Sequence, residues 1–109
     1  MKNNELYSLL ASLVSTNSVS GNEKGIVDFL DDKFTSLGFA VHRMESGSIC
    51  GVLDGDRPGK TVLLDAHIDT VTVPDKSKWT HDPFSLTRDN GRLYGRGTSD
   101  MKGGLAAII

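Results

Sequence analysis

The chain has 109 residues, enough for at most one domain with a modest hydrophobic core. The formal net charge is −2 and the lysines and arginines are scattered, so no basic patch indicates nucleic acid or an anionic membrane as a partner. A single cysteine, Cys50, excludes an internal disulfide framework, and its apolar neighbours predict a buried, inert thiol. Because neither a signal peptide nor a run of membrane-spanning length is found, we expect a cytoplasmic protein.

Two amphipathic helices are predicted in the first third of the chain. Apolar residues within 6–14 recur with the three- and four-residue spacing of a helix that buries one face. After a polar break, Ser20 and Glu23 have the spacing of a capping box, and a second apolar series follows that ends before Gly38. We interpret both helices as structural cover for a β-sheet.

Three strands are predicted in the middle of the chain. Residues 39–44 alternate in polarity, residues 49–53 form a second short apolar run, and a turn lies between them. His42, inside the first run, is interpreted as a solvated edge residue. Residues 61–66 are almost continuously apolar, which is typical of a central strand buried on both faces.

A polar, irregular loop is predicted over residues 70–84. A loop of this length in a compact domain is usually functional or disordered. Trp79 and Phe84 are interpreted as apolar anchors for it, and His81 and Asp82 as residues that stabilise the loop rather than bind metal.

The C-terminal quarter begins with a predicted hairpin. Asn90-Gly91 stands between two short β-like runs, which is the strongest short-range hairpin signal. After Tyr94 a glycine-rich stretch leads into a last helix, which resembles the opening of a buried helix. We expect that the chain is truncated within this helix.

His67 and Asp69 form the first chemically suggestive pair. Side chains two residues apart in an extended segment lie on the same side, so these two are expected to meet at the end of a strand. A carboxylate on one ring nitrogen of a histidine fixes its tautomer and orientation for a metal on the other nitrogen. Asp100 adds a further carboxylate in a glycine-rich setting where the backbone can approach a site closely.

These motifs together resemble the co-catalytic zinc amidohydrolases of the M20 peptidase family. That family includes acetylornithine deacetylases, succinyl-diaminopimelate desuccinylases, aminoacylases and carboxypeptidases. Three stretches carry the resemblance, Asp65–Val71, Trp79–Phe84 and Gly91–Ala107. It implies an α/β fold in which residues 1–109 are the N-terminal part of a zinc-peptidase-like catalytic domain, with helices packed on a mixed β-sheet and the dimerisation (lid) domain absent.

The resemblance also implies roles for individual residues. His67 is expected to bind one zinc ion, and Asp100 to be the carboxylate that bridges two. Asp69 is expected to be the catalytic residue that orients His67. The complete site would hold two Zn²⁺ ions, with Co²⁺ or Mn²⁺ as substitutes. A cis peptide bond is expected after the bridging aspartate, between Asp100 and Met101.

The function implied is a metallopeptidase-type hydrolase that cleaves amide bonds of N-acyl amino acids or small peptides. The general base in such enzymes is the first of two adjacent glutamates, but here all glutamates precede the His67 motif: Glu5, Glu23 and Glu45. We therefore expect half an active site and no activity of this chain alone. The alternatives are a non-catalytic relative that serves binding or assembly, and a one-metal site. No nucleic acid or membrane partner is expected, and a homodimer of the complete protein stays open.

Overall fold

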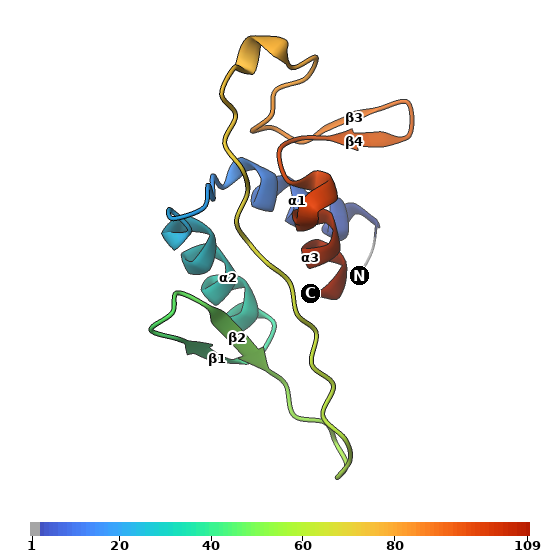
Figure 1. The fold of residues 1–109 in the computed structure, drawn as a ribbon. Helices are drawn as coiled ribbons and strands as arrows, with labels where there is room; N and C mark the ends of the chain where they lie inside the picture. Colours follow the sequence, from blue (N-terminus) through green and yellow to red (C-terminus); the bar gives the residue numbers. More distant parts are fainter. Residues whose placement is uncertain (1–2) are drawn as a thin grey trace.

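The computed structural model describes residues 3–109 as helices, short hairpins and one long extended segment (Figure 1). The N-terminal half runs through two helices and a hairpin, and the C-terminal half through a loop, a second hairpin and a final helix. The elements in chain order are α1 (Asn3–Ser15), α2 (Lys24–Ser36), β1 (Ala40–Arg43), β2 (Ile49–Val52), η1 (Lys76–Lys78), β3 (Thr87–Asp89), β4 (Arg92–Tyr94), η2 (Thr98–Lys102) and α3 (Gly103–Ile108).

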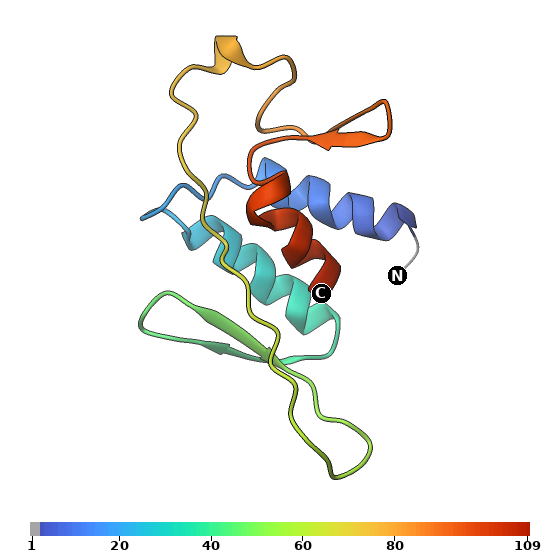
Figure 2. The same ribbon diagram turned by 45° about the vertical axis from the view of Figure 1, so that its right-hand side comes forward.

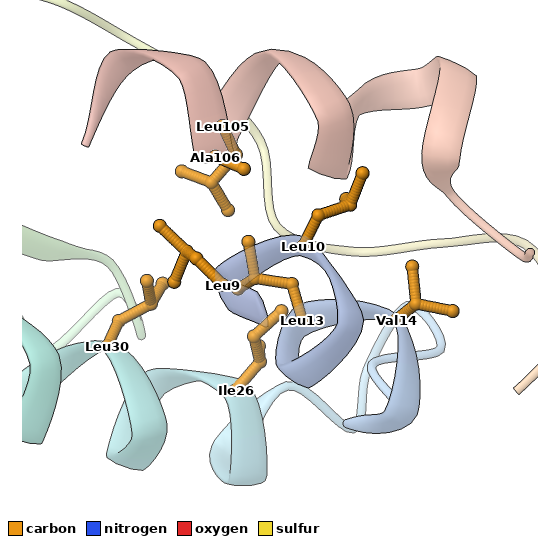
Figure 3. Close-up of a cluster of buried hydrophobic side chains, with 8 residues drawn as sticks. All are labelled: Leu9, Leu10, Leu13, Val14, Ile26, Leu30, Leu105 and Ala106. Atoms are coloured by element: carbon orange, nitrogen blue, oxygen red, sulfur yellow. The ribbon is translucent and has the colours of Figure 1, made fainter. Parts of the chain in front are cut away.

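The hydrophobic core lies where the three α-helices meet (Figure 3). Leu13 of α1 and Ile26 of α2 are both fully buried, and Leu105 of α3 closes the cluster from the other side of α1. The apolar spacing that predicted the first two helices is therefore confirmed, because the residues of each series share one face and pack together.

Each hairpin is antiparallel and two-stranded. β1 pairs with β2, and Arg43 at the end of β1 fastens the hairpin to α2 through Asp28 (2.7 Å) and Asp31 (2.6 Å). β3 pairs with β4 across Asn90 (φ 47°) and Gly91 (φ 75°), as the turn sequence predicts. Cys50, on β2, is half-buried rather than fully buried.

The α/β fold class is confirmed, but the central strand predicted over residues 61–66 is not formed within the described residues. This segment is extended, has no ladder partner, and belongs to the long yellow-green to yellow stretch that passes in front of α2 (Figure 2). Leu63 is 81% exposed and Val62 79% exposed. Apolar character predicts a buried strand only if other strands lie beside it, and residues 3–109 place none there. The expected mixed sheet is represented here by two antiparallel hairpins and one parallel bridge, Val19 with Thr70.

The capping box predicted at the start of α2 is also wrong. Glu23 occupies the N-cap position without a side-chain capping bond, and its carboxylate accepts a hydrogen bond from the Gly21 backbone N–H instead. The hydroxyl of Ser20 points elsewhere and donates to Asp69. α2 ends as predicted, since Gly38 follows it with φ 85°.

No helix in the described part of the chain is long and apolar enough to cross a membrane.

Candidate metal centre

His67 lies between two carboxylates. Its Nε2 is 2.7 Å from Oδ1 of Asp100, and its Nδ1 is 3.1 Å from Oδ1 of Asp69. The structure thus brings together all three residues that the sequence singled out, including Asp100 from a stretch 33 residues further along the chain. The site is open, because the side chains of His67 and Asp69 are 46% and 40% exposed and that of Asp100 is 86% exposed.

The two carboxylates shift the charge balance of the histidine. The hydrogen bond with Asp100 is the main cause that raises the pKa of His67 above its ordinary value, partial burial opposes it, and Asp69 adds to it. The pKa of Asp69 is lowered, first by the hydrogen bond from Ser20 and then by His67. The centre therefore favours a positive charge on His67, beside an Asp69 carboxylate that is stabilised in its ionised form.

The connector between α1 and α2 holds the segment that carries His67 and Asp69. The Ser18 hydroxyl donates to the Ile68 carbonyl (2.8 Å), and the Thr70 N–H donates to the Ser18 carbonyl (2.9 Å). The Ser20 N–H then donates to the Thr70 carbonyl (3.1 Å). Ser18 and Thr70 are buried, so these hydrogen bonds hold the end of the extended segment against the α1–α2 connector.

Asp100 is carried by a tightly packed turn. Gly97 precedes the turn η2 with φ 86°, and a Cβ placed on it would lie 2.9 Å from Cγ2 of Thr70. Asp100 itself has extended backbone angles (φ −140°, ψ 94°), and the Asp100–Met101 peptide bond is cis, as the family resemblance implies. Only glycine fits at position 97 without displacing the neighbouring Thr70.

Lys102 fastens this turn to α1. Its side chain is buried, and its Nζ donates hydrogen bonds to the Leu13 carbonyl (2.7 Å) and the Thr16 carbonyl (2.8 Å) at the end of that helix. Burial lowers the pKa of Lys102 to about 8. A cation at a helix C-terminus satisfies carbonyls that have no partner inside the helix.

A pocket of about 410 Å³ opens beside His67 and Asp100. Trp79 of the predicted loop and Arg96 both line this pocket. The Arg96 guanidinium lies 4.8 Å from the centre of the Trp79 ring and donates to the Thr72 carbonyl (3.1 Å). Trp79 therefore anchors the loop as the sequence analysis predicted, with Arg96 as its partner.

Donor chemistry at this centre fits a zinc ion in part. An imidazole nitrogen and a carboxylate oxygen are ordinary zinc donors, and Asp69 occupies the other ring nitrogen as in many zinc sites. Two donors on one tetrahedral ion lie about 3.3 Å apart for bonds of about 2 Å. The 2.7 Å separation is shorter than that, and a small rotation of the exposed Asp100 would open it. Across residues 3–109, no group of three or more potential ligands surrounds one point.

Comparison with known proteins shows which protein family and which enzymes have sequences similar to this chain. Residues 63–109 match the family described as Peptidase family M20/M25/M40. Succinyl-diaminopimelate desuccinylase 1 of Ruegeria sp. is 39% identical over 103 residues, which cover 92% of this chain and 27% of that protein. The corresponding enzyme of Buchnera aphidicola is 33% identical over 109 residues, covering 100% of this chain and 29% of that protein.

Solved structures agree with the sequence match. The M20 family metallo-carboxypeptidase Sso-CP2 from Sulfolobus solfataricus superposes with a TM-score of 0.79 at 32% identity, covering 98% of this chain and 25% of that one. The chain is a relative of the M20 peptidases. Human carnosine dipeptidase 1 is also similar, with a TM-score of 0.75 at 25% identity, covering 95% of this chain and 26% of that one.

These matches confirm the family resemblance and the α/β fold. They also show how much of each similar protein this chain covers. The chain spans between 25% and 29% of the length of these M20 proteins. The individual roles predicted for His67, Asp69 and Asp100 stay predictions.

Sequence reasoning missed two residues around this centre. Ser20 was assigned to helix capping, because Ser-x-x-Glu is the capping-box spacing and nothing local indicates a partner 49 residues away. Lys102 was not singled out. A signal existed, since a lysine between the predicted ligand Asp100 and the glycines of an apolar helix start is a charge in a buried setting.

Proposed function

We propose that this chain supplies part of the active site of a zinc-dependent hydrolase that cleaves amide bonds of N-acyl amino acids or small peptides. Within it, His67 would hold one zinc ion, Asp100 would be the carboxylate shared by the two zinc ions, and Asp69 would be the catalytic residue that orients His67. The observation that carries the proposal is the placement of His67 between Asp69 and Asp100. The names of the desuccinylase and carboxypeptidase relatives support the reaction type.

In this arrangement each residue has a separate task. With a metal bound, Asp69 would accept the Nδ1–H of His67 and so leave the lone pair of Nε2 to the metal, on the side where Asp100 lies. Asp100 supplies anionic oxygens on the opposite side, where an acidic ligand offsets the charge of a divalent ion. When bound, zinc would polarise the amide carbonyl and lower the pKa of the attacking water. The general base is not among the three glutamates of this chain, which all precede His67.

The test is mutagenesis in the longest reading frame that contains residues 1–109, with bound zinc and hydrolysis of a panel of N-acyl amino acids measured together. His67→Ala should lose both zinc and turnover. Asp69→Asn should keep more zinc while activity falls about 10 to 100-fold, since the residue acts through the histidine. His42→Ala and Asp54→Asn are matched controls, because both residues are exposed and lie outside the centre. Equal zinc loss in the His67 and Asp69 variants would contradict the division of roles.

The 109-residue chain alone should not turn over substrate. It offers two of the three or four protein ligands that a zinc site normally has, and no glutamate follows Glu45. The assay is hydrolysis by the purified chain with added zinc, beside the longer protein. Comparable rates would place the general base within residues 1–109 and overturn the assignment.

The other candidate is a non-catalytic relative that serves binding or assembly. The exposed apolar side chains of residues 62–64 favour it, because a contiguous apolar surface usually contacts another polypeptide. This alternative predicts that binding or assembly does not depend on zinc, and that the longer reading frame contains no adjacent pair of glutamates. Finding that pair, together with zinc-dependent hydrolysis, would exclude it.

A further inference from the structure

The hydroxyl of Ser20 makes a short contact that neither helix capping nor the proposed zinc ligands explain. Ser20 Oγ lies 2.6 Å from Oδ2 of Asp69, while Oδ1 of the same carboxylate faces Nδ1 of His67 at 3.1 Å. Each oxygen of Asp69 therefore has its own partner. The only other acceptor near the Ser20 hydroxyl among the described residues, the Thr70 carbonyl, is 3.5 Å away, so the proton is directed to Asp69.

We propose that Ser20 is a positioning residue for the zinc site, which fixes the Asp69 carboxylate and, through it, the ring orientation and tautomer of His67. The consequence for zinc binding and catalysis rests on the proposed function, whereas the positioning of Asp69 and His67 by Ser20 rests on the geometry alone. The centre is then a chain of four side chains in hydrogen-bonding contact, from Ser20 through Asp69 and His67 to Asp100.

The backbone around Ser20 holds its hydroxyl in place. The Ser20 N–H donates to the Thr70 carbonyl, and the Thr70 N–H donates to the Ser18 carbonyl, so positions 18–20 are hydrogen-bonded to the residues that flank Asp69. Ser18 is fully buried, which keeps water from competing at this joint. A hydroxyl on such a fixed support restrains a carboxylate more than one on a mobile loop would.

Asp69 needs this restraint because it is partly exposed. At 40% exposure its carboxylate can rotate toward solvent, whereas the Asp100 carboxylate competes for the proton of the same imidazole from the Nε2 side. A neutral imidazole carries one proton, which belongs to either Nδ1 or Nε2. By holding Asp69 within hydrogen-bonding distance of Nδ1, Ser20 favours the Nδ1–H tautomer against this competition, and that is the tautomer that would leave Nε2 available to a metal.

The helix-capping role that competes with this proposal is not fulfilled by Ser20. Glu23 is the N-cap of α2, no side-chain capping bond is formed there, and the spacing of Ser20 and Glu23 is not used as a capping box. Loss of the Ser20 hydroxyl should therefore change the metal centre more than it changes α2.

The first experiment measures the tautomer of His67 by ¹⁵N NMR of the imidazole in the zinc-free longer protein, at a pH where the ring is neutral. An Asp100→Ala background is used throughout, because Oδ1 of Asp100 lies 2.7 Å from Nε2 and favours a proton there when no metal is bound. The parent should show predominantly Nδ1–H, Ser20→Ala should lose that preference, and Ser20→Thr should keep it because the hydroxyl is retained at an exposed position. Ser36→Ala is the matched control, since Ser36 is an exposed serine of α2 whose hydroxyl donates only locally, to the Lys33 carbonyl.

The second experiment measures zinc affinity, with the metal alone as the probe, in the longer reading frame. Ser20→Ala should weaken binding by about 3 to 10-fold, at or below the low end of the effect of a partner that touches the ligand directly. Ser20→Thr should restore it, and Ser36→Ala should leave it unchanged. Far-UV circular dichroism checks that each variant keeps its helices.

The outcomes separate the two proposals. If Ser20→Ala matches Ser36→Ala in both tautomer and zinc affinity, or if a folded Ser20→Thr fails to recover, the role of Ser20 is refuted. If the parent and His67→Ala both fail to bind zinc, the proposed function fails, while the tautomer measurement still decides whether Ser20 positions His67.

Discussion

Gly97 offers the sharpest test of how the two ligand-bearing stretches are held together. We predict that Gly97→Ala destabilises the chain more than Gly47→Ala, although both glycines have nearly the same left-handed backbone angle (φ 86° and φ 89°). The difference lies in their surroundings. A Cβ on Gly47 meets nothing within 4 Å, whereas a Cβ on Gly97 lies 2.9 Å from Cγ2 of Thr70 and 3.1 Å from Cδ of Lys102.

The magnitude follows from these two contributions. A left-handed conformation costs a residue with a Cβ about 1–2 kcal/mol, and both variants incur it. Overpacking against buried neighbours costs about 1–3 kcal/mol more, and only Gly97→Ala incurs that. Thr70 is 5% exposed and Lys102 2% exposed, so neither can move into solvent without losing its own hydrogen bonds. The total for Gly97→Ala is therefore about 2–5 kcal/mol.

Urea unfolding of the chain measures the difference, followed by circular dichroism and by the fluorescence of Trp79, the one tryptophan. Thr70→Ser removes the methyl group that the new Cβ would meet. The double variant Thr70→Ser/Gly97→Ala should therefore recover part of the loss, as a coupling energy of about 0.5–3 kcal/mol. Equal destabilisation by the two single glycine variants, or no coupling with Thr70→Ser, would refute the close-packing argument.

Three further predictions concern the rest of the fold. Hydrogen bonds from Lys24 and then Arg43 hold the pKa of Asp28 below its ordinary value, so the stability that Asp28 contributes is present at neutral pH and is lost as the pH falls below about 4. In Asp28→Asn, the urea midpoint should therefore fall less between pH 7 and pH 3 than in the parent. The same acid dependence in both proteins would contradict this. Leu13→Ala empties a fully buried position and should cost about 3–5 kcal/mol by the same assay, a loss under 1 kcal/mol arguing against the helical core. Arg96→Ala removes the stacking partner of Trp79 and should speed tryptic cleavage in the 70–84 loop, which unchanged digestion would disprove.

Local patterns predicted most of the elements. The helical spacing of residues 6–14 and the glycine after α2 predicted two helices, and Asn90-Gly91 predicted the β3–β4 hairpin. These features depend on neighbours three or four positions away or on the allowed angles of single residues. The two-residue spacing of His67 and Asp69 likewise predicted their contact, because alternation in an extended segment is a local property. The placement of Asp100 next to His67 came from the family resemblance, not from spacing.

Only the tertiary structure decided which long-range partners each polar group found. The Ser20 hydroxyl binds Asp69 rather than capping α2, because the parallel bridge between Val19 and Thr70 brings the two segments together. Lys102 is buried because the end of α1 offers it two carbonyls. The apolar run 61–66 stays exposed, since burial of a strand requires neighbours that the described residues do not place beside it. A sequence encodes the conformational preference of a segment, whereas hydrogen-bond partners and burial depend on which distant segments the fold brings within a few ångströms of it.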